Sequence, residues 1–234
     1  MAAQEIALIV GAGPGLSASL ARLFRKEGMK VALAAREVGK LGDLVREIDG
    51  HSYACDASDP QSVENLFASV SKDIGAPNLV VYNASGRVRG PLIELDSEAV
   101  RKTIMITCYG GFLVGQAAAR QMLKAGSGTI LFTGASASVK GYANSAAFAM
   151  GKMGLTGLAQ SMARELQPKN IHVAQVVIDG GINEPMRRPE RLAERGPDGA
   201  LDPDAIAQTY LHLHRQHRSA WASHVELRPW AEKF

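Results

Sequence analysis

A short glycine-rich segment, Gly11-Ala12-Gly13-Pro14-Gly15, is the part of the sequence best suited to bind a ligand. Glycines in a turn between a strand and a helix let the backbone approach a diphosphate, and the first helical turn offers N–H groups and the positive end of its dipole. The spacing departs from GxGxxG, and glycine clusters also occur in ordinary turns. Because an apolar strand pattern precedes the segment and a helical pattern follows it, we predict a dinucleotide site.

Two later residues could select the nucleotide. Arg36 follows an apolar run at residues 31–35, where an acidic residue would bind a ribose 2′-hydroxyl and an arginine accommodates a 2′-phosphate. This favours NADP over NAD, although the same arginine could simply be solvated at a strand end. Asp56 ends another strand pattern and could accept a hydrogen bond from the adenine amino group, or equally cap a turn.

These residues are placed by a regular alternation of strand and helix patterns. Apolar runs typical of buried parallel strands occur at residues 6–10, 31–35, 52–55, 79–82, 129–133 and 171–178. Helical periodicity lies between them, at residues 17–26, 38–48, 62–74, 97–123 and 145–166. This order predicts an α/β protein, with a doubly wound parallel sheet in a single domain over residues 1–234. A weaker run at 225–227 could be a seventh strand.

The C-terminal part of the chain has a different character. Residues 184–204 contain four prolines and several arginines, and they directly follow the last strong strand, so we expect a lid over a bound molecule. The arginines there could clamp an anionic substrate or lie on a solvated face. Residues 219–234, with Trp221 and Trp230, are expected to close the sheet or contact another subunit.

Composition narrows the class of protein. The 234 residues are 46% hydrophobic and carry a net charge of only +3, which is ordinary for a globular domain and too small to indicate nucleic-acid binding. Cys55 and Cys108 lack the spacing of a metal site or a disulfide framework, which favours a reducing cytoplasm. Neither a secretory signal nor an apolar run of ~20 residues is present, so no membrane partner is expected.

As a set, these motifs resemble the short-chain dehydrogenase/reductase family. The resemblance spans about residues 6–182 and includes the glycine turn, Asn83-Ala84-Ser85-Gly86 in place of Asn-Asn-Ala-Gly, and Asp179-Gly180 in place of Pro-Gly. It implies a Rossmann fold with seven parallel strands, NAD(P) along its C-terminal edge, and a homodimer or homotetramer built on the long fourth and fifth helices. The cofactor-binding residues that it implies are Gly11, Gly13, Pro14, Gly15, Leu16, Asp56, Ala57, Asn83, Ala84, Ser85, Gly180 and Ile182.

The resemblance also implies an altered active site. The family uses a Ser-Tyr-Lys set with an assisting asparagine; the tyrosine exchanges a proton with the substrate oxygen, and the lysine lowers its pKa and holds the nicotinamide ribose. Here Lys152 matches the lysine, whereas Phe148 stands at the tyrosine position, Ala135 at the serine position and Thr107 at the asparagine position. Phenylalanine has no proton to give.

Two nearby residues could replace the missing groups, and with Lys152 they complete the predicted catalytic set. Ser136, next to the serine position, could orient a substrate oxygen or only hydrogen-bond at the start of a helix. Tyr142 precedes the fifth helix and could donate the proton or only pack in its loop. Lys152 could bind the cofactor ribose even without a tyrosine, or be a surface lysine.

The sequence therefore predicts an NADP-dependent oxidoreductase that reduces a carbonyl or oxidises an alcohol, with a non-standard site and a small-molecule substrate that could be anionic. Loss of a general acid typically slows a reaction by ~10² to 10⁴ without preventing cofactor binding. One alternative is a dinucleotide-binding protein with little or no redox activity, acting as a sensor or an oligomer subunit. Another is a reductase of an activated carbon–carbon double bond, which needs less from a phenolic acid.

Overall fold

The seven predicted strands form one parallel sheet in the computed structural model, which describes residues 4–183, 196 and 198–231. Their order is β3-β2-β1-β4-β5-β6-β7, which confirms the doubly wound α/β fold and the seventh strand. The bounds are β1 Ile6–Val10, β2 Lys30–Ala35, β3 His51–Ala54, β4 Leu79–Tyr82, β5 Gly128–Thr133, β6 Ile171–Ile178 and β7 His224–Leu227.

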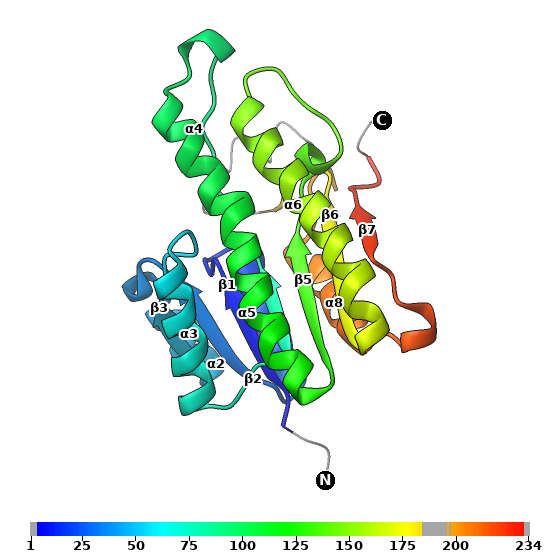
Figure 1. Ribbon diagram of the computed structural model, residues 1–234. Helices are drawn as coiled ribbons and strands as arrows, with labels where there is room; N and C mark the ends of the chain where they lie inside the picture. Colours follow the sequence, from blue (N-terminus) through cyan, green and yellow to red (C-terminus); the bar gives the residue numbers. More distant parts are fainter. Residues whose placement is uncertain (1–3, 184–195, 197, 232–234) are drawn as a thin grey trace.

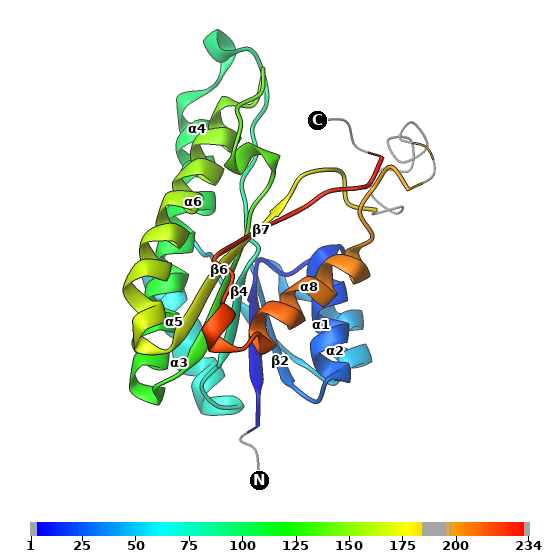
Figure 2. The same cartoon turned by 90° about the vertical axis from the view of Figure 1, so that its right-hand side faces the viewer.

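Helices cover both faces of this sheet (Figure 2). One apolar core joins the sheet to α1 Leu16–Lys26, α2 Gly42–Ile48 and α8 Pro203–Arg215. The other core joins it to α3 Pro60–Asp73, α5 Gly110–Ala125 and α6 Ala146–Leu166. Because both faces are covered, every residue of β1, β4 and β6 is buried, as their continuous apolar runs predicted.

The long helix predicted at residues 97–123 is continuous but not uniform (Figure 1). It runs as α4 Ser97–Ile104, a π-helical turn Met105–Tyr109, and α5. The helix predicted at 38–48 begins instead with a 3₁₀ turn, Val38–Leu41, before α2. Among the described residues, no helix is long and apolar enough to cross a membrane.

Aspartates set the start of several helices. Asp59 accepts a hydrogen bond from the Gln61 amide at 3.1 Å, with Pro60 in the first helical turn, and α3 therefore starts at Pro60 rather than at residue 62. Asp96 caps α4 and Asp202 caps α8 in the same way. By contrast, α1 follows Gly15, whose side chain can offer no cap.

The topology brings the predicted site to one edge of the sheet. Strand β1 pairs with β2 on one side and β4 on the other, so the strand order reverses between β1 and β4, which is where doubly wound sheets bind ligands beyond the carboxyl ends of their strands. The glycine turn follows β1, and the Asn83-Ala84-Ser85-Gly86 motif follows β4.

The proposed lid lies mostly outside the described residues, including the arginines at 187, 188, 191 and 195. Its two flanks pair with each other: the Leu201 amide donates to the Gly181 carbonyl, and the Asn183 amide to the Leu201 carbonyl, both at 2.8 Å. In the C-terminal segment, Trp221 stacks on His172 within its own chain, with ring centroids 4.7 Å apart, whereas Trp230 is exposed.

Candidate active site

The glycine turn is fastened to its neighbours through its backbone. The Gly11 and Ala12 amides both donate to the Ala34 carbonyl at 2.9 Å, which ties the turn to the end of β2. Gly11 has a φ of +88°, and a side chain there would collide with the backbone of Ala84, so only glycine fits. At Gly13 a side chain would meet nothing within 4 Å, so the bare backbone borders open space.

The first turn of α1 faces that space without a competing anion. Its N-cap, Gly15, makes no side-chain cap, and its first turn contains no acidic residue. The Ala18 and Ser19 amides already donate to the Gly15 carbonyl, so the amides before Ala18 and the positive end of the helix dipole are the groups available to a negatively charged group. The turn and the helix end together form a backbone cradle that fits a diphosphate.

Asn83 braces this cradle from β4. Its amide donates to the Val10 carbonyl at 2.8 Å, and its Nδ2 donates to Ser17 Oγ at 2.8 Å. The Ser17 hydroxyl in turn donates to the Gly11 carbonyl at 3.2 Å. Sequence reasoning placed Asn83 beside a ribose and missed Ser17, whose partners come together only when the start of α1 meets the end of β4.

Arg36 and Asp56 lie near each other, just beyond the ends of β2 and β3. Asp56 Oδ1 accepts hydrogen bonds from the Ser58 amide at 2.9 Å and from its hydroxyl at 2.6 Å. These bonds, followed by the positive charge of Arg36, lower the pKa of Asp56. Asp56 is thus an ionised acceptor that also caps its own turn. Ala57 packs in the core, where its carbonyl lies against Gly110.

Lys152 is buried at the end of β5. It lies on α6, only 3% of it is exposed, and its Nζ donates to the Thr133 carbonyl at 2.7 Å. Burial, helped by the charge of Arg87, lowers the pKa of Lys152 to about 7. The side chain is therefore not a surface lysine, and near neutral pH it can hold or release a proton.

Phe148 lies one helical turn before Lys152 and is 7% exposed. It packs against Ala135, Ala137 and Ala149. The guanidinium carbon of Arg87 lies 4.0 Å from the Phe148 ring centroid, and Lys152 Nζ lies 5.8 Å from it. Sequence reasoning missed Arg87, because the only feature that marks this residue in the sequence is its position directly after the Asn-Ala-Ser-Gly motif.

Thr107 connects the helix to the segment that carries Arg87. It lies in the π-helical turn, a feature often found at functional sites, and its Oγ1 accepts a hydrogen bond from the Gly86 amide at 2.9 Å. On its other side it packs closely against Gly151 of α6, where a Cβ would approach Thr107 Cβ to 2.9 Å. Thr107 thus holds the segment after β4 against α6.

Residues 5–195 match the family model described as short chain dehydrogenase. The chain belongs to the short-chain dehydrogenase family. The 3-oxoacyl-[acyl-carrier-protein] reductase MabA of Mycobacterium tuberculosis is 32% identical over 194 residues, which are 83% of this chain and 75% of MabA. A short-chain dehydrogenase structure from Rhodopseudomonas palustris is 35% identical with a TM-score of 0.82, and the match covers 97% of this chain and 99% of that one. A metagenomic short-chain oxidoreductase in complex with NADP is 29% identical with a TM-score of 0.83, covering 96% and 97%.

In this short-chain dehydrogenase, the two serines after β5 have different surroundings. Ser136 is half-buried at the start of the 3₁₀ turn Ser136–Ser138, and its carbonyl accepts the Val139 and Lys140 amides at 3.1 Å. Ser138 is buried, and its Oγ accepts the Ala135 amide at 3.1 Å. Ser138 therefore stabilises the turn, and Ser136 remains the candidate for orienting a substrate oxygen.

Tyr142 lies in the segment before α6. It is 46% exposed, and its ring centroid lies 5.8 Å from Lys140 Nζ. Lys140 also faces Asp179 at 3.5 Å, and the Tyr142 hydroxyl and this carboxylate raise the pKa of Lys140. Asp179, where the family usually has proline, is bonded to Arg228 at 2.7 Å. The structure thus gives Tyr142 contacts with this ion cluster.

The end of β6 completes the edge of the short-chain dehydrogenase fold. Gly180 lies against Pro229, where a Cβ would come within 2.6 Å of Cδ, so a larger residue would displace the segment after β7. Ile182 forms an isolated parallel bridge with Leu201. These contacts hold both predicted cofactor-binding residues beyond the carboxyl end of β6.

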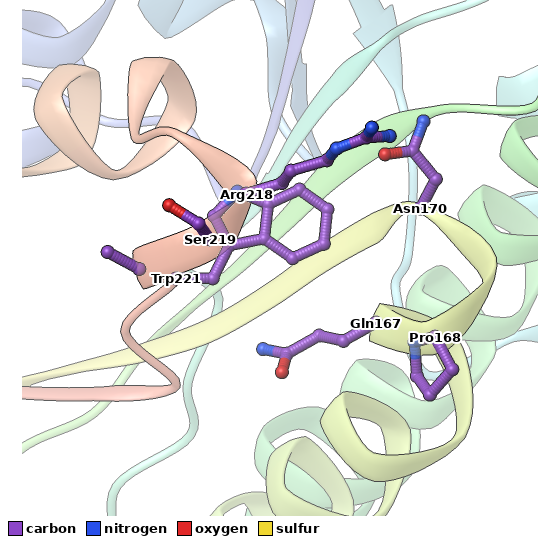
Figure 3. A pocket seen from close by; sticks show the side chains of 7 residues that line it. Gln167, Pro168, Asn170, Arg218, Ser219 and Trp221 are labelled. Atoms are coloured by element: carbon purple, nitrogen blue, oxygen red, sulfur yellow. The ribbon is translucent and has the colours of Figure 1, made fainter.

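A separate polar hollow of about 370 Å³ lies at the opposite end of the sheet (Figure 3). Gln167 and Asn170 from the turn before β6 face Arg218 and Trp221 across it. Because ligands of doubly wound sheets bind at the carboxyl ends of the strands, this hollow does not belong to the candidate active site.

Proposed function

We propose that this protein is an NADP-dependent oxidoreductase that interconverts a carbonyl and an alcohol in a small molecule. Its site is non-standard, because Phe148 stands where the family has its catalytic tyrosine. The observation that carries the proposal is the place of Lys152: its amine is buried one helical turn after Phe148 and donates to the Thr133 carbonyl, and this burial lowers its pKa to about 7. A group with a pKa near the working pH is suited to general acid–base catalysis, so Lys152 can exchange the proton that Phe148 lacks.

The backbone cradle, Arg36 and Asp56 would hold the nucleotide end of the cofactor, and Gly180 and Ile182 its nicotinamide end. When bound, NADPH supplies a hydride and NADP⁺ accepts one. Arg36 beside the ionised Asp56 supports recognition of a 2′-phosphate, because a guanidinium forms charge-assisted hydrogen bonds with phosphate oxygens. The NADP bound to the 29% identical metagenomic relative agrees with this preference.

The chain's own residues then account for the proton and the substrate. In reduction, the Lys152 ammonium gives a proton to the substrate oxygen, and the Ser136 hydroxyl would orient that oxygen. The cations of Lys152 and Arg87 beside Phe148 favour a substrate that carries or develops negative charge. Tyr142 remains a second candidate donor. The name of the 32% identical mycobacterial relative supports carbonyl reduction.

Purified protein incubated with NADPH and a panel of ketones, oxo acids and enones tests this function. We expect NADPH to be oxidised, and mass spectrometry to find the alcohol as product. Calorimetry on the same preparation measures NADPH binding independently. Tight NADPH binding without turnover of any panel member would refute the oxidoreductase function. It would support the alternative of a dinucleotide-binding sensor or oligomer subunit with little or no redox activity, which the absence of a phenol at Phe148 favours. A saturated ketone formed from an enone would instead support reduction of the double bond.

We also propose that the protein is a homodimer or homotetramer joined through α5 and α6. Large apolar side chains lie exposed on these helices: Phe112 is 40% exposed, Met150 55% and Met153 42%. Tyr109 stacks on Phe112 with ring centroids 6.1 Å apart, which extends the apolar surface. Exposed apolar patches of this kind often mark interfaces between subunits.

A further inference from the structure

Two cations flank one aromatic ring in the site. The Arg87 guanidinium carbon lies 4.0 Å from the centroid of Phe148, within the range of a cation–π contact, and Lys152 Nζ lies 5.8 Å from the same centroid. The ring is 7% exposed, whereas Arg87 is exposed at the surface. A molecule that approaches from solvent therefore meets the guanidinium before it reaches the ring.

The backbone beside Arg87 is held in place. The preceding Gly86 donates its amide to Thr107 Oγ1 at 2.9 Å, and a Cβ on Gly86 would come within 2.8 Å of Thr103 Cα, one helical turn earlier on the same long helix. The long helix thus positions the start of the Arg87 side chain, and the Phe148 ring supports its end. A guanidinium held at both ends loses less conformational freedom when it binds an anion.

The two cations also affect each other. The charge of Arg87 adds to burial in lowering the pKa of Lys152, since two positive charges repel. Lys152 donates its hydrogen bond to the Thr133 carbonyl. This acceptor carries no net charge, so it does not cancel the repulsion between the two cations. A negative charge placed near both groups would be attracted by both.

We propose that Arg87 is a catalytic residue: its guanidinium, stacked on Phe148, binds the substrate oxygen through its N–H groups and stabilises the oxyanion formed there. This assignment rests on the proposed function. In reduction, NADPH would supply a hydride: one of its C–H bonds breaks, a C–H bond forms at the carbonyl carbon, and the C=O π pair moves onto the oxygen, which leaves NADP⁺. Arg87 keeps its own protons and donates hydrogen bonds to that oxygen. Lys152 transfers a proton to form the O–H bond, becomes a neutral amine, and is reprotonated by water.

Kinetics of Arg87→Gln and Arg87→Lys test this assignment, with Arg89→Gln as the matched control on the same segment. Removing an oxyanion donor typically costs ~10²-fold or more in kcat. We therefore expect about a 10²-fold lower kcat for Arg87→Gln on neutral ketones, a smaller loss for Arg87→Lys, and unchanged NADPH affinity. Arg89→Gln should behave as wild type. A rise in KM confined to anionic substrates would overturn the assignment, because Arg87 would then bind a remote carboxylate.

A readout without cofactor separates contact from misfolding. In protein labelled with ¹³C at the lysine ε carbon, with the Lys152 signal assigned by its loss in Lys152→Met, the pKa of Lys152 should rise in Arg87→Gln and not in Arg89→Gln. Reduced turnover with a lower melting temperature and an unchanged Lys152 pKa would make Arg87 merely structural. If wild type is active and Arg87→Gln equals it, only this assignment fails. If wild type reduces no carbonyl, the proposed function fails first.

Discussion

Lys152 is an ionisable side chain in a buried position, where a charged group costs free energy. Burial removes the water that would solvate the ammonium, and the Thr133 carbonyl provides a single strong acceptor in exchange. The protein therefore holds an amine whose protonation changes near neutral pH, instead of one that is always charged. Such perturbed groups are concentrated at functional sites, where they cost stability and supply chemistry.

This cost makes stability depend on pH in a defined direction. The pKa of Lys152 is depressed from 10.5 to about 7 on folding, so the unfolded chain binds more protons in that window. The contribution of Lys152 to stability is complete above about pH 10.5 and is lost as pH falls toward 7. Urea unfolding without cofactor should therefore show wild type gaining stability relative to Lys152→Met between pH 7 and 10. Parallel curves for the two proteins would contradict a buried, depressed lysine.

The same group predicts the pH dependence of catalysis. As the proton donor for reduction, Lys152 must be protonated, so kcat/KM for reduction should fall as pH rises through about 7, and alcohol oxidation should rise. Steady-state profiles in both directions measure this. Arg87→Gln should move both profiles to higher pH, because a neighbouring positive charge is removed. A reduction rate that is flat from pH 6 to 9 would exclude Lys152 as the donor.

Phe148→Tyr tests whether the missing phenol limits the rate. The substitution adds a hydroxyl one helical turn before Lys152, so we expect carbonyl reduction to rise by about 10²-fold, the lower end of what a general acid contributes. Initial rates at saturating NADPH measure it, with Phe148→Leu as the control for altered packing. If the tyrosine variant binds NADPH as wild type does but reduces the carbonyl no faster, the missing phenol does not limit the rate, and Arg87 and Lys152 already supply the acid catalysis.

At the scale of elements, the long helix contains a π-helical turn between α4 and α5. That turn brings Thr107 against Gly86 on one side and Gly151 on the other, so one side chain joins three parts of the site. Periodicity predicted a helix at this position, because π and α turns bury similar stripes. It could not predict the turn itself, since the extra backbone residue shows only when the partners of Thr107 are known.

Thr107→Val removes this connection without changing the volume of the side chain. The Gly86 amide then loses its acceptor, and we expect the free energy of unfolding to fall by about 1–3 kcal/mol. Turnover should fall as well, because the segment that carries Arg87 is less firmly held. Denaturant titration and kinetics measure the two effects, and Thr107→Ser, which keeps the hydroxyl, serves as control. Equal losses in both variants would show that the methyl group matters instead.

At the scale of the whole molecule, the parallel sheet explains what could be predicted. The carboxyl ends of its strands share one edge, so the glycine turn, Asn83 and Thr133 meet there although they are far apart in the sequence. Strand patterns and the glycine turn were therefore enough to predict a candidate site at this edge of the sheet. The contact of Arg87 with Phe148 depends on how the segment after β4 packs against α6, and no spacing within the sequence encodes it.

In the assembly proposed above, copies of this molecule would meet through the outer flank formed by α5 and α6 (Figure 2). Met150 and Met153 are exposed there. Contact with a partner would bury the apolar surface of these two side chains. Sedimentation should show wild type as a dimer or tetramer, and Met150→Glu with Met153→Glu should shift it to a smaller species, because each glutamate would lose its solvation at an apolar interface. Val139→Glu places a charge at another exposed apolar residue and should leave the assembly intact. A monomeric wild type, or an unchanged double variant, would mean that α5 and α6 do not form the interface.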